Sequence, residues 1–554
     1  MLTDHAGLSP FERLLTLFTR VRPGEGRSVQ LYFLHGFLLL FCYMIVKALR
    51  EAFMLTNFSA EVRAYAVAVI ALVLMLVVPA YGAVRRRLDG AQLLHAVTLF
   101  FASNMLLFSL LAWAGVSIAF VFFVWVSIFG VMMIAQFWAF AADSYNIKSG
   151  QRLFPVIMMG ANLGALAGAK TAQLAVASLS PVGLMLLSTL VLTATLLLAK
   201  PERQSVPAGS KAVAAEHGKP VPRLMGGIGL VLRDRYLLLI ALLVVLLNWI
   251  NTTGEFILAD FVQTDAQRRV AESGGVLHES DLITAFYGDF QFWVTLVGLG
   301  IQLFLVSRLY RHPAVGVRGA LLIHPLIVAI GYGLLAISPL LVGFVPVFTL
   351  LRLVKIAENS IDYSLMNTTR HALFLPVDRD SKYDGKTAID TFFWRFGDLI
   401  QAGVVFAGLH WLSWGAQQFA LLNLVLALGW IALAVQIGRE FGRKARENVI
   451  NVAPEAGQPI PDLAYVPGRS FDYVVAEDAF HDADPGDVLQ LTARLADGRP
   501  LPNWLRFDPN ARRFTGQPPE GHFEEVTITV IASDVDGLEA QSTFVLKGRV
   551  IRHS

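Results

Sequence analysis

Residues 358–398 read ENSIDYSLMNTTRHALFLPVDRDSKYDGKTAIDTFFWRFGD and lie between two long apolar segments. Glu358 and Asp362 at the start, and Asp390, Arg395 and Asp398 at the end, fall inside segments that are otherwise apolar. Ionisable side chains are costly within a lipid bilayer and usually serve a function there. The stretch therefore predicts a membrane protein with charged groups inside its helical bundle.

The composition of the whole chain points the same way. Of its 554 residues, 55% are hydrophobic and only 16% are charged, whereas soluble domains carry about 25% charged residues. The single cysteine, Cys42, excludes an internal disulfide, and a net charge of +3 is too small to indicate a nucleic-acid partner. Residues 1–27 show no secretory signal.

A membrane span needs about 20 apolar residues. By that measure we predict twelve transmembrane helices in two six-helix halves, residues 29–199 and 236–447, with a cytoplasmic N-terminal segment at 1–28 and a cytoplasmic linker at 200–235. The predicted spans are Val29–Thr56, Tyr65–Val84, Leu93–Trp113, Val116–Ala141, Phe154–Ala177, Pro181–Ala199, Tyr236–Val262, Leu282–Val306, Gly319–Ile337, Pro339–Met366, Ala388–His410 and Gly415–Ile437.

Residues 455–550 have a different pattern, because no apolar run there is long enough to span a membrane. Short alternating segments are separated by turn residues, which is typical of a β-sandwich of about 100 residues. The predicted strands are Asp472–Val475, Val488–Leu495, Val526–Ala532 and Ser542–Lys547. We expect Trp504, Phe507 and Phe514 in its core.

The distribution of Lys and Arg over the connections predicts the orientation. One set of connections is poor in charge, and its Glu61 and Arg63 are expected to offset each other. The other set is basic, which places both termini in the cytoplasm. Its residues are Arg85, Arg86, Arg87, Lys148, Arg152, Lys200, Arg203, Lys211, Lys219, Arg223, Arg308, Arg311, Arg379, Lys382 and Lys386.

Two six-helix halves joined by a cytoplasmic linker match the major facilitator architecture, in which substrate binds at the midplane between the halves. A channel or a polytopic enzyme is the alternative. Embedded charges in both halves favour the transporter, and the candidate substrate-binding residues are Lys47, Arg50, Glu51, Asn162, Lys170, Glu255, Arg352, Glu358, Lys386, Asp390 and Arg395.

The first-span segment KALREAF contains three of these candidate residues. Lys47 shares a helix face with Arg50 and Glu51, and two cations with one anion suit an anionic substrate such as a phosphate. The alternative is that they lie near the helix end and reach the membrane surface. Glu255 and Glu358 would order the site or couple protons, although Glu358 could instead belong to an internally neutralised ladder with Arg352, Lys355 and Asp362.

Gly160, Gly164 and Gly168 recur every four residues in the fifth span. We expect them to let another helix pack closely, while Lys170 is either a substrate contact or part of this packing. No GxxxxGK[ST] loop, HExxH or Cys-rich metal site is evident. We therefore expect no enzymatic activity, no cofactor and no bound metal in the membrane part.

Several stretches resemble the nucleotide transporter (ATP/ADP translocase) family of intracellular bacteria and plastids. They are VRPGEGR at 21–27, KALREAF at 47–53, FWAFAAD at 137–143, RLFPVIMMGANLGALAGA at 152–169 and DYSLMNTTRHALFLPVDRDSKYDGKTAID at 362–390. The resemblance covers about residues 15–443. It implies exchange of ATP for ADP, or import of other nucleotides, across the bacterial inner membrane.

In this resemblance Lys47, Glu255 and Lys386 stand at positions that look like the family's functional charges. The chain departs from the pattern in the fourth span, where Val126 occupies the place of an acidic residue. Two alternatives stay open: a proton-coupled major-facilitator carrier of another organic anion, and a membrane-anchored interaction protein that uses its β domain.

Residues 455–550 resemble a dystroglycan-type cadherin-like domain, in segments such as AFHDADPGDVLQLTARLADGRPLPNWLRFD and TVIASDVDGLEAQSTFVL. The predicted partners are a nucleotide or another anionic solute, membrane lipid, and a protein partner for this domain. Asp482, Asp484, Asp534 and Asp536 could bind calcium through oxygen ligands, but aspartates of this kind are more often turn-forming residues.

Overall fold

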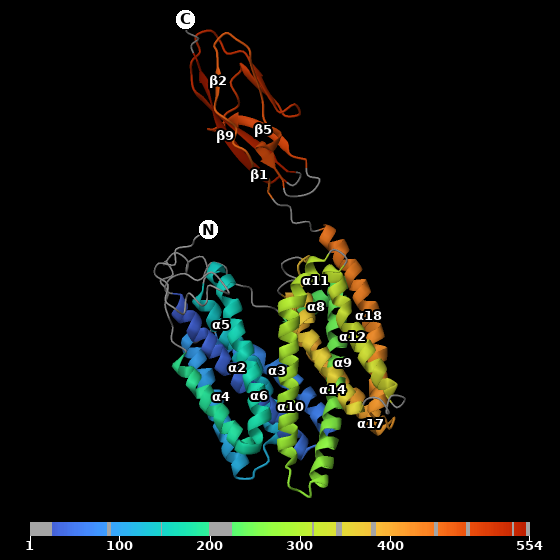
Figure 1. Cartoon of the computed structure of the whole chain (residues 1–554). Coiled ribbons are helices and arrows are strands. Elements are labelled where there is room, and N and C mark those ends of the chain that lie inside the picture. The colour runs from blue at the N-terminus through green and yellow to red at the C-terminus, as the bar shows by residue number, and fades with distance from the viewer. Residues whose placement is uncertain are drawn as a thin grey trace. The chain divides into compact units, whose positions relative to one another are not determined.

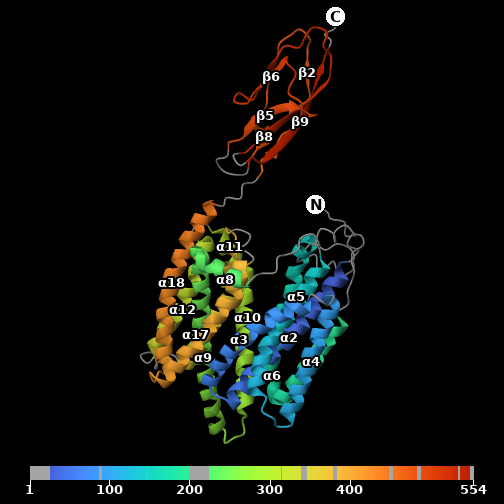
Figure 2. The same cartoon turned by 180° about the vertical axis from the view of Figure 1, so that it is seen from behind.

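A computed structural model describes residues 25–85, 90–145, 147–198, 224–312, 315–338, 346–377, 384–447, 453–482, 488–534 and 537–549. It divides into two compact units, residues 1–445 and 446–554. The first unit is helical and the second is built of β-strands (Figures 1 and 2). The predicted fold class, a polytopic helical membrane protein with a C-terminal β domain, is confirmed.

Five long helices make up the first half of the membrane unit: α2 (Gly26–Asn57), α3 (Ala60–Arg85), α4 (Gly90–Trp113), α5 (Ala119–Ser144) and α6 (Ile147–Ala194), which η1 (Thr195–Leu197) follows. Helix α6 contains both the fifth and the sixth predicted spans. They are separated at Ser180, whose φ of 60° interrupts the helix. Pro181 comes next, where a helix that starts again tolerates a missing N–H.

The second half is more broken. It contains α8 (Leu224–Arg233), α9 (Arg235–Glu272), α10 (Glu279–Gly300), η2 (Ile301–Val306), α11 (Ser307–Arg311), α12 (Gly316–Ala336), α14 (Val347–Ile361), η3 (Asp362–Met366), α15 (Asn367–Ala372), α16 (Lys386–Ala388), η5 (Ile389–Phe393), α17 (Trp394–His410) and α18 (Ala416–Glu447). Three of these, η2, η3 and η5, are π-helical turns. Such turns are rare and concentrate at functional sites.

Ten helical segments of the described residues are long and apolar enough to cross a membrane. One of them is α6, with its two spans, and the tenth predicted span is the broken run α14–η3–α15. Each of the twelve predicted spans therefore coincides, over its described residues, with a helical segment. The end of the predicted linker differs from the prediction, because it forms helix α8. In this helix Val231 is fully buried, and Ile228 and Leu230 pack on the helical core.

Close packing of α2 against α6 holds the first half together. A Cβ atom on Gly164 would lie 2.0 Å from the carbonyl oxygen of Phe37, and one on Gly168 would lie 2.2 Å from that of Phe41. Gly160 approaches Phe33 in the same way, at 2.5 Å. The predicted role of these glycines in helix packing is confirmed.

The C-terminal unit consists of β1 (Glu455–Ala456), β2 (Leu463–Tyr465), β3 (Phe471–Val474), β4 (Phe480–His481), β5 (Gln490–Leu495), β6 (Leu505–Asp508), β7 (Arg513–Gly516), β8 (Val526–Ser533) and β9 (Glu539–Gly548). They form a four-stranded sheet in the order β2-β9-β8-β5, a three-stranded sheet in the order β3-β7-β6, and the pair β1-β4. Phe514 is fully buried, with Trp504 and Phe507 packed against the same core.

Candidate functional site

A cavity of about 340 Å³ lies within the membrane unit, where residues of both halves line it. Its size falls in the range of small-molecule pockets. The charged side chains in its wall are four cations and four carboxylates, so pairing between them decides which cation is available to a ligand. They are Lys47, Arg50, Arg63, Arg395, Glu51, Glu255, Asp362 and Asp398.

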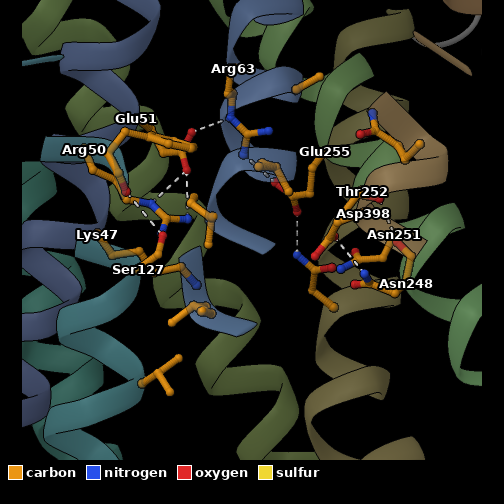
Figure 3. A pocket seen from close by; sticks show the side chains of 18 of the residues that line it. Lys47, Arg50, Glu51, Arg63, Ser127, Asn248, Asn251, Thr252, Glu255 and Asp398 are labelled. Atoms are coloured by element: carbon orange, nitrogen blue, oxygen red, sulfur yellow. Dashed lines mark hydrogen bonds and ion pairs between the residues drawn. The ribbon is translucent and has the colours of Figure 1, made fainter. Parts of the chain in front are cut away.

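Arg63, on α3, joins the two halves (Figure 3). Its Nε lies 2.6 Å from Oε2 of Glu51 on α2, and its Nη2 lies 3.6 Å from Oε2 of Glu255 on α9. Arg50 also reaches Glu51, with 3.1 Å between Nη2 and Oε1, and donates to the hydroxyl of Ser127 on α5. The buried Glu51 and the partly buried Glu255 are therefore neutralised within the wall.

Lys47 differs from its neighbours. Its Nζ donates to the amide oxygen of Gln291 on α10, at 3.1 Å. Among the described residues, no carboxylate lies within 4.0 Å of this Nζ. Lys47 thus presents a positive charge in the cavity that holds only a neutral partner.

Behind Glu255 lies a second group of charges. Nζ of Lys355, whose side chain is fully buried, lies 3.1 Å from Oε1 of Glu358 and 3.8 Å from Oε1 of Glu255. The hydroxyl of Tyr332 donates to Oε2 of Glu358 at 2.9 Å, and Nδ2 of Asn359 donates to Glu255 at 3.0 Å. Buried charges are tolerated when they are paired in this way.

The opposite wall is organised by Asn248 of α9. Its Nδ2 donates to Oδ1 of Asp398 and to the carbonyl oxygen of Trp394, at 2.7 Å each. Arg395 donates to the other oxygen of Asp398 at 3.4 Å. Trp394 directly follows the π-helical turn η5, so these bonds tie α9 to the irregular start of α17.

Five of the residues predicted for the site line this cavity: Lys47, Arg50, Glu51, Glu255 and Arg395. The other six do not. Glu358 stands one layer behind, where it pairs with Lys355. Lys170 and Arg352 both contact Asp289, and Lys386 of α16 pairs with Asp390 of η5. Asn162 lies half-buried in α6.

Arg63 was missed by the sequence reasoning. The expectation that it offsets Glu61 at the membrane surface is wrong, because its side chain is only 5% exposed and binds Glu51 and Glu255. Glu61 instead accepts from Tyr65 at 2.6 Å and contacts His410 at 2.7 Å. A cation within the first turn of a span looks like a surface residue until its neighbours are known.

Asp398 and Gln401 were also left out of the predicted site, although both line the cavity. The available signal is that Trp394, Asp398 and Gln401 are four and three residues apart and so share one helix face.

Val126, which the resemblance sets in place of an acidic residue, is buried in the apolar core, whereas Ser127 beside it reaches the cavity. Asp484 and Asp536, two of the four aspartates considered as calcium ligands or turn residues, lie outside the described residues.

Solved structures with a similar fold are membrane transporters. A peptide transporter POT in complex with sulfate matches with a TM-score of 0.53 at 12% identity, over 79% of this chain and 99% of that chain. A bacterial homologue of iron transporter ferroportin in an inward-facing state matches with a TM-score of 0.51, also at 12% identity, over 74% and 98%. At this identity the likeness establishes the fold alone.

Sequence comparisons find relatives with a named activity. ADP,ATP carrier protein 1 of Chlamydia pneumoniae is 26% identical over 381 residues, which are 61% of this chain and 70% of that protein. Its counterpart from Chlamydia trachomatis is 25% identical over 362 residues, 58% of this chain and 65% of that protein. The second match thus spans slightly less than two thirds of the relative.

Two family models match separate parts of the chain. The model of the TLC ATP/ADP transporter matches residues 285–441, and the model described as "Putative Ig domain" matches residues 452–547. The predicted resemblance to nucleotide transporters is confirmed. The second model assigns the strand-rich part to an Ig domain, also a β-sandwich, without naming the cadherin-like type. The chain is therefore a multi-pass membrane protein related to the TLC ATP/ADP transporters, and it carries an Ig-like domain after its membrane unit.

Proposed function

We propose that this protein is a secondary transporter that exchanges nucleotides of the ATP and ADP type by alternating access, and not an enzyme. The observation that carries the proposal is Lys47, a cation in the cavity between the halves whose polar partner within the described part of the chain is the amide of Gln291. A phosphate oxygen in place of that neutral amide would add the attraction between opposite charges to the hydrogen bond of Lys47.

The same contact suggests how binding couples to movement. Lys47 belongs to the first half and Gln291 to the second, so their hydrogen bond joins the halves. Gln263 of the second half adds further links: it donates to the carbonyl oxygens of Leu55 and Phe58 and accepts from the amide of Ala60. A nucleotide that displaces Gln291 would remove one of these links and favour the exchange of conformations.

The decisive variant is Lys47→Ala in proteoliposomes loaded with ADP. Hydrogen bonds to charged groups contribute about 1.5–3 kcal/mol, so we expect uptake of labelled ATP to fall by about tenfold or more. Lys547→Ala, which removes an exposed lysine of the β domain, serves as the control with unchanged uptake. Undiminished exchange by Lys47→Ala would contradict the assignment of the site.

We also propose that the protein resides in a bacterial inner membrane, surrounded by lipid, with both termini and the β domain on the cytoplasmic side. The basic connections of the sequence support this orientation. Protease added outside intact cells should leave the β domain uncut, whereas protease added to inverted membranes should release it. Cleavage from the outside of intact cells would reverse the orientation.

A further inference from the structure

The two walls of the cavity offer different chemistry. Figure 3 shows Lys47, Arg50 and Ser127 on one side, and Asn248, Asn251, Thr252 and Asp398 on the other. The first side presents cations, while the second is rich in amides and hydroxyls, with Trp394 nearby in the same lining. A ligand with a charged end and a neutral heterocyclic end would fit such a cavity in one direction.

Gln401 is exceptional on the second wall. Its residue is only 1% exposed, and neither its Oε1 nor its Nε2 has a hydrogen-bond partner within the described part of the chain. Buried amides are nearly always paired, so an unpaired one needs an explanation. Gln401 lines the cavity, but its two amide atoms are themselves covered, so a turn of the side chain into the cavity is needed for a ligand to supply both missing bonds.

The neighbouring amides already have partners. Asn248 donates to Asp398 and to the carbonyl oxygen of Trp394, and Oδ1 of Asn251 accepts from Lys355 at 2.9 Å. Of the described lining residues, Tyr287 also has an unpaired buried polar atom, its hydroxyl. The hydroxyl of Tyr287 offers its donor and its acceptor from a single atom, whereas the amide of Gln401 offers a donor and an acceptor on two neighbouring atoms.

We infer that Gln401 binds the base of the transported nucleotide, with its Oε1 accepting from the exocyclic amino group of adenine and its Nε2 donating to the adjacent ring nitrogen. Adenine presents this donor and acceptor together, and Gln side chains bind it in the same bidentate manner in nucleic acids. The phosphates then lie toward Lys47. The inference rests on the proposed function and assigns the base-reading residue within it.

The test is equilibrium binding of ADP, GDP and inorganic pyrophosphate to the purified full-length protein. Gln401→Leu keeps the size of the side chain but removes both bonds, so ADP affinity should fall about tenfold while pyrophosphate affinity stays within about twofold. Gln302→Leu, at an exposed glutamine of η2, is the matched control and should bind all three ligands as the wild type does.

Gln401→Glu provides an independent measurement. A carboxylate offers two acceptors, which suit the two N–H groups on the guanine edge and repel the ring nitrogen of adenine. The ratio of ADP affinity to GDP affinity should therefore fall by about tenfold relative to the wild type. A purine riboside diphosphate that lacks the amino group should bind the wild type less tightly than ADP does.

Unchanged ADP affinity in Gln401→Leu, or an equal loss of ADP and pyrophosphate affinity, would overturn the role of Gln401. An unaltered preference between ADP and GDP in Gln401→Glu would do the same. Failure of the proposed function looks different, because the wild-type protein would then bind neither ADP nor pyrophosphate.

Discussion

Arg63 and Arg513 each bind a carboxylate through a hydrogen-bonded ion pair, but in very different surroundings. The pair of Arg63 with Glu51 lies in the membrane unit, with side chains 5% and 4% exposed. The pair of Arg513 with Asp472 joins β7 to β3 in the C-terminal unit, where both side chains are 49% exposed. The chemistry is nearly the same, so burial is the difference between them.

Burial changes what the pair does. An exposed pair gains little from attraction, because water screens it and both side chains lose freedom. A buried pair is also weak evidence for stability, yet the loss of one partner leaves an uncompensated charge, which is costly. Replacing Arg63 is therefore expected to cost much stability, and replacing Arg513 little. Three variants, taken from the largest expected loss of stability to the smallest, test this contrast.

The largest effect is expected for Arg63→Ala, because the link between the carboxylates of Glu51 and Glu255 is lost. Of the described cations, Glu51 then keeps Arg50, and Glu255 keeps the more distant Lys355. Removing one partner of a buried pair costs about 3–5 kcal/mol. Thermal unfolding of the purified protein should show a clear loss of stability, and nucleotide exchange should disappear. Arg63→Lys keeps the charge and should lose less. A stable, active Arg63→Ala protein would break the comparison.

An intermediate effect is expected for Lys355→Met, since Glu358 keeps its bond from Tyr332 and Glu255 keeps Arg63 and Asn359. The free energy of unfolding should fall by about 3 kcal/mol, the lower end of the range for removing one partner of a buried ion pair. Adding Glu358→Gln removes the stranded charge and should restore part of the stability. If the double variant unfolds at a lower temperature than Lys355→Met, the argument from unpaired charge is wrong.

The smallest effect is expected for Asp472→Asn in the β domain, where thermal unfolding at neutral pH should be almost unchanged. The hydrogen bond from Arg513 lowers the pKa of Asp472. A lowered folded-state pKa contributes stability above the unfolded value, about 4, and this is lost as the pH falls through the folded value. The wild type and Asp472→Asn should therefore differ least at the most acidic pH; a difference as large as that of Arg63→Ala would contradict the contrast.

The sequence by itself predicted the apolar helical segments, the β domain and five of the cavity-lining residues. Hydropathy and strand alternation depend on residues that are neighbours in the sequence, so both can be read without a structure. Lys47, Arg50 and Glu51 could be found for the same reason, because charges three and four residues from a lysine inside an apolar span stand out without knowledge of their neighbours.

Only the tertiary structure decided which of those charged side chains pair with each other. Arg63 sits close to the end of its span, and whether it faces water or Glu51 depends on how α3 packs between the two halves. Gln401 carries no charge and attracts no attention in an apolar helix, and its unpaired amide becomes visible only when its surroundings are complete. Pairing and burial are properties of distant segments brought together, so hydropathy along the chain could not reveal them.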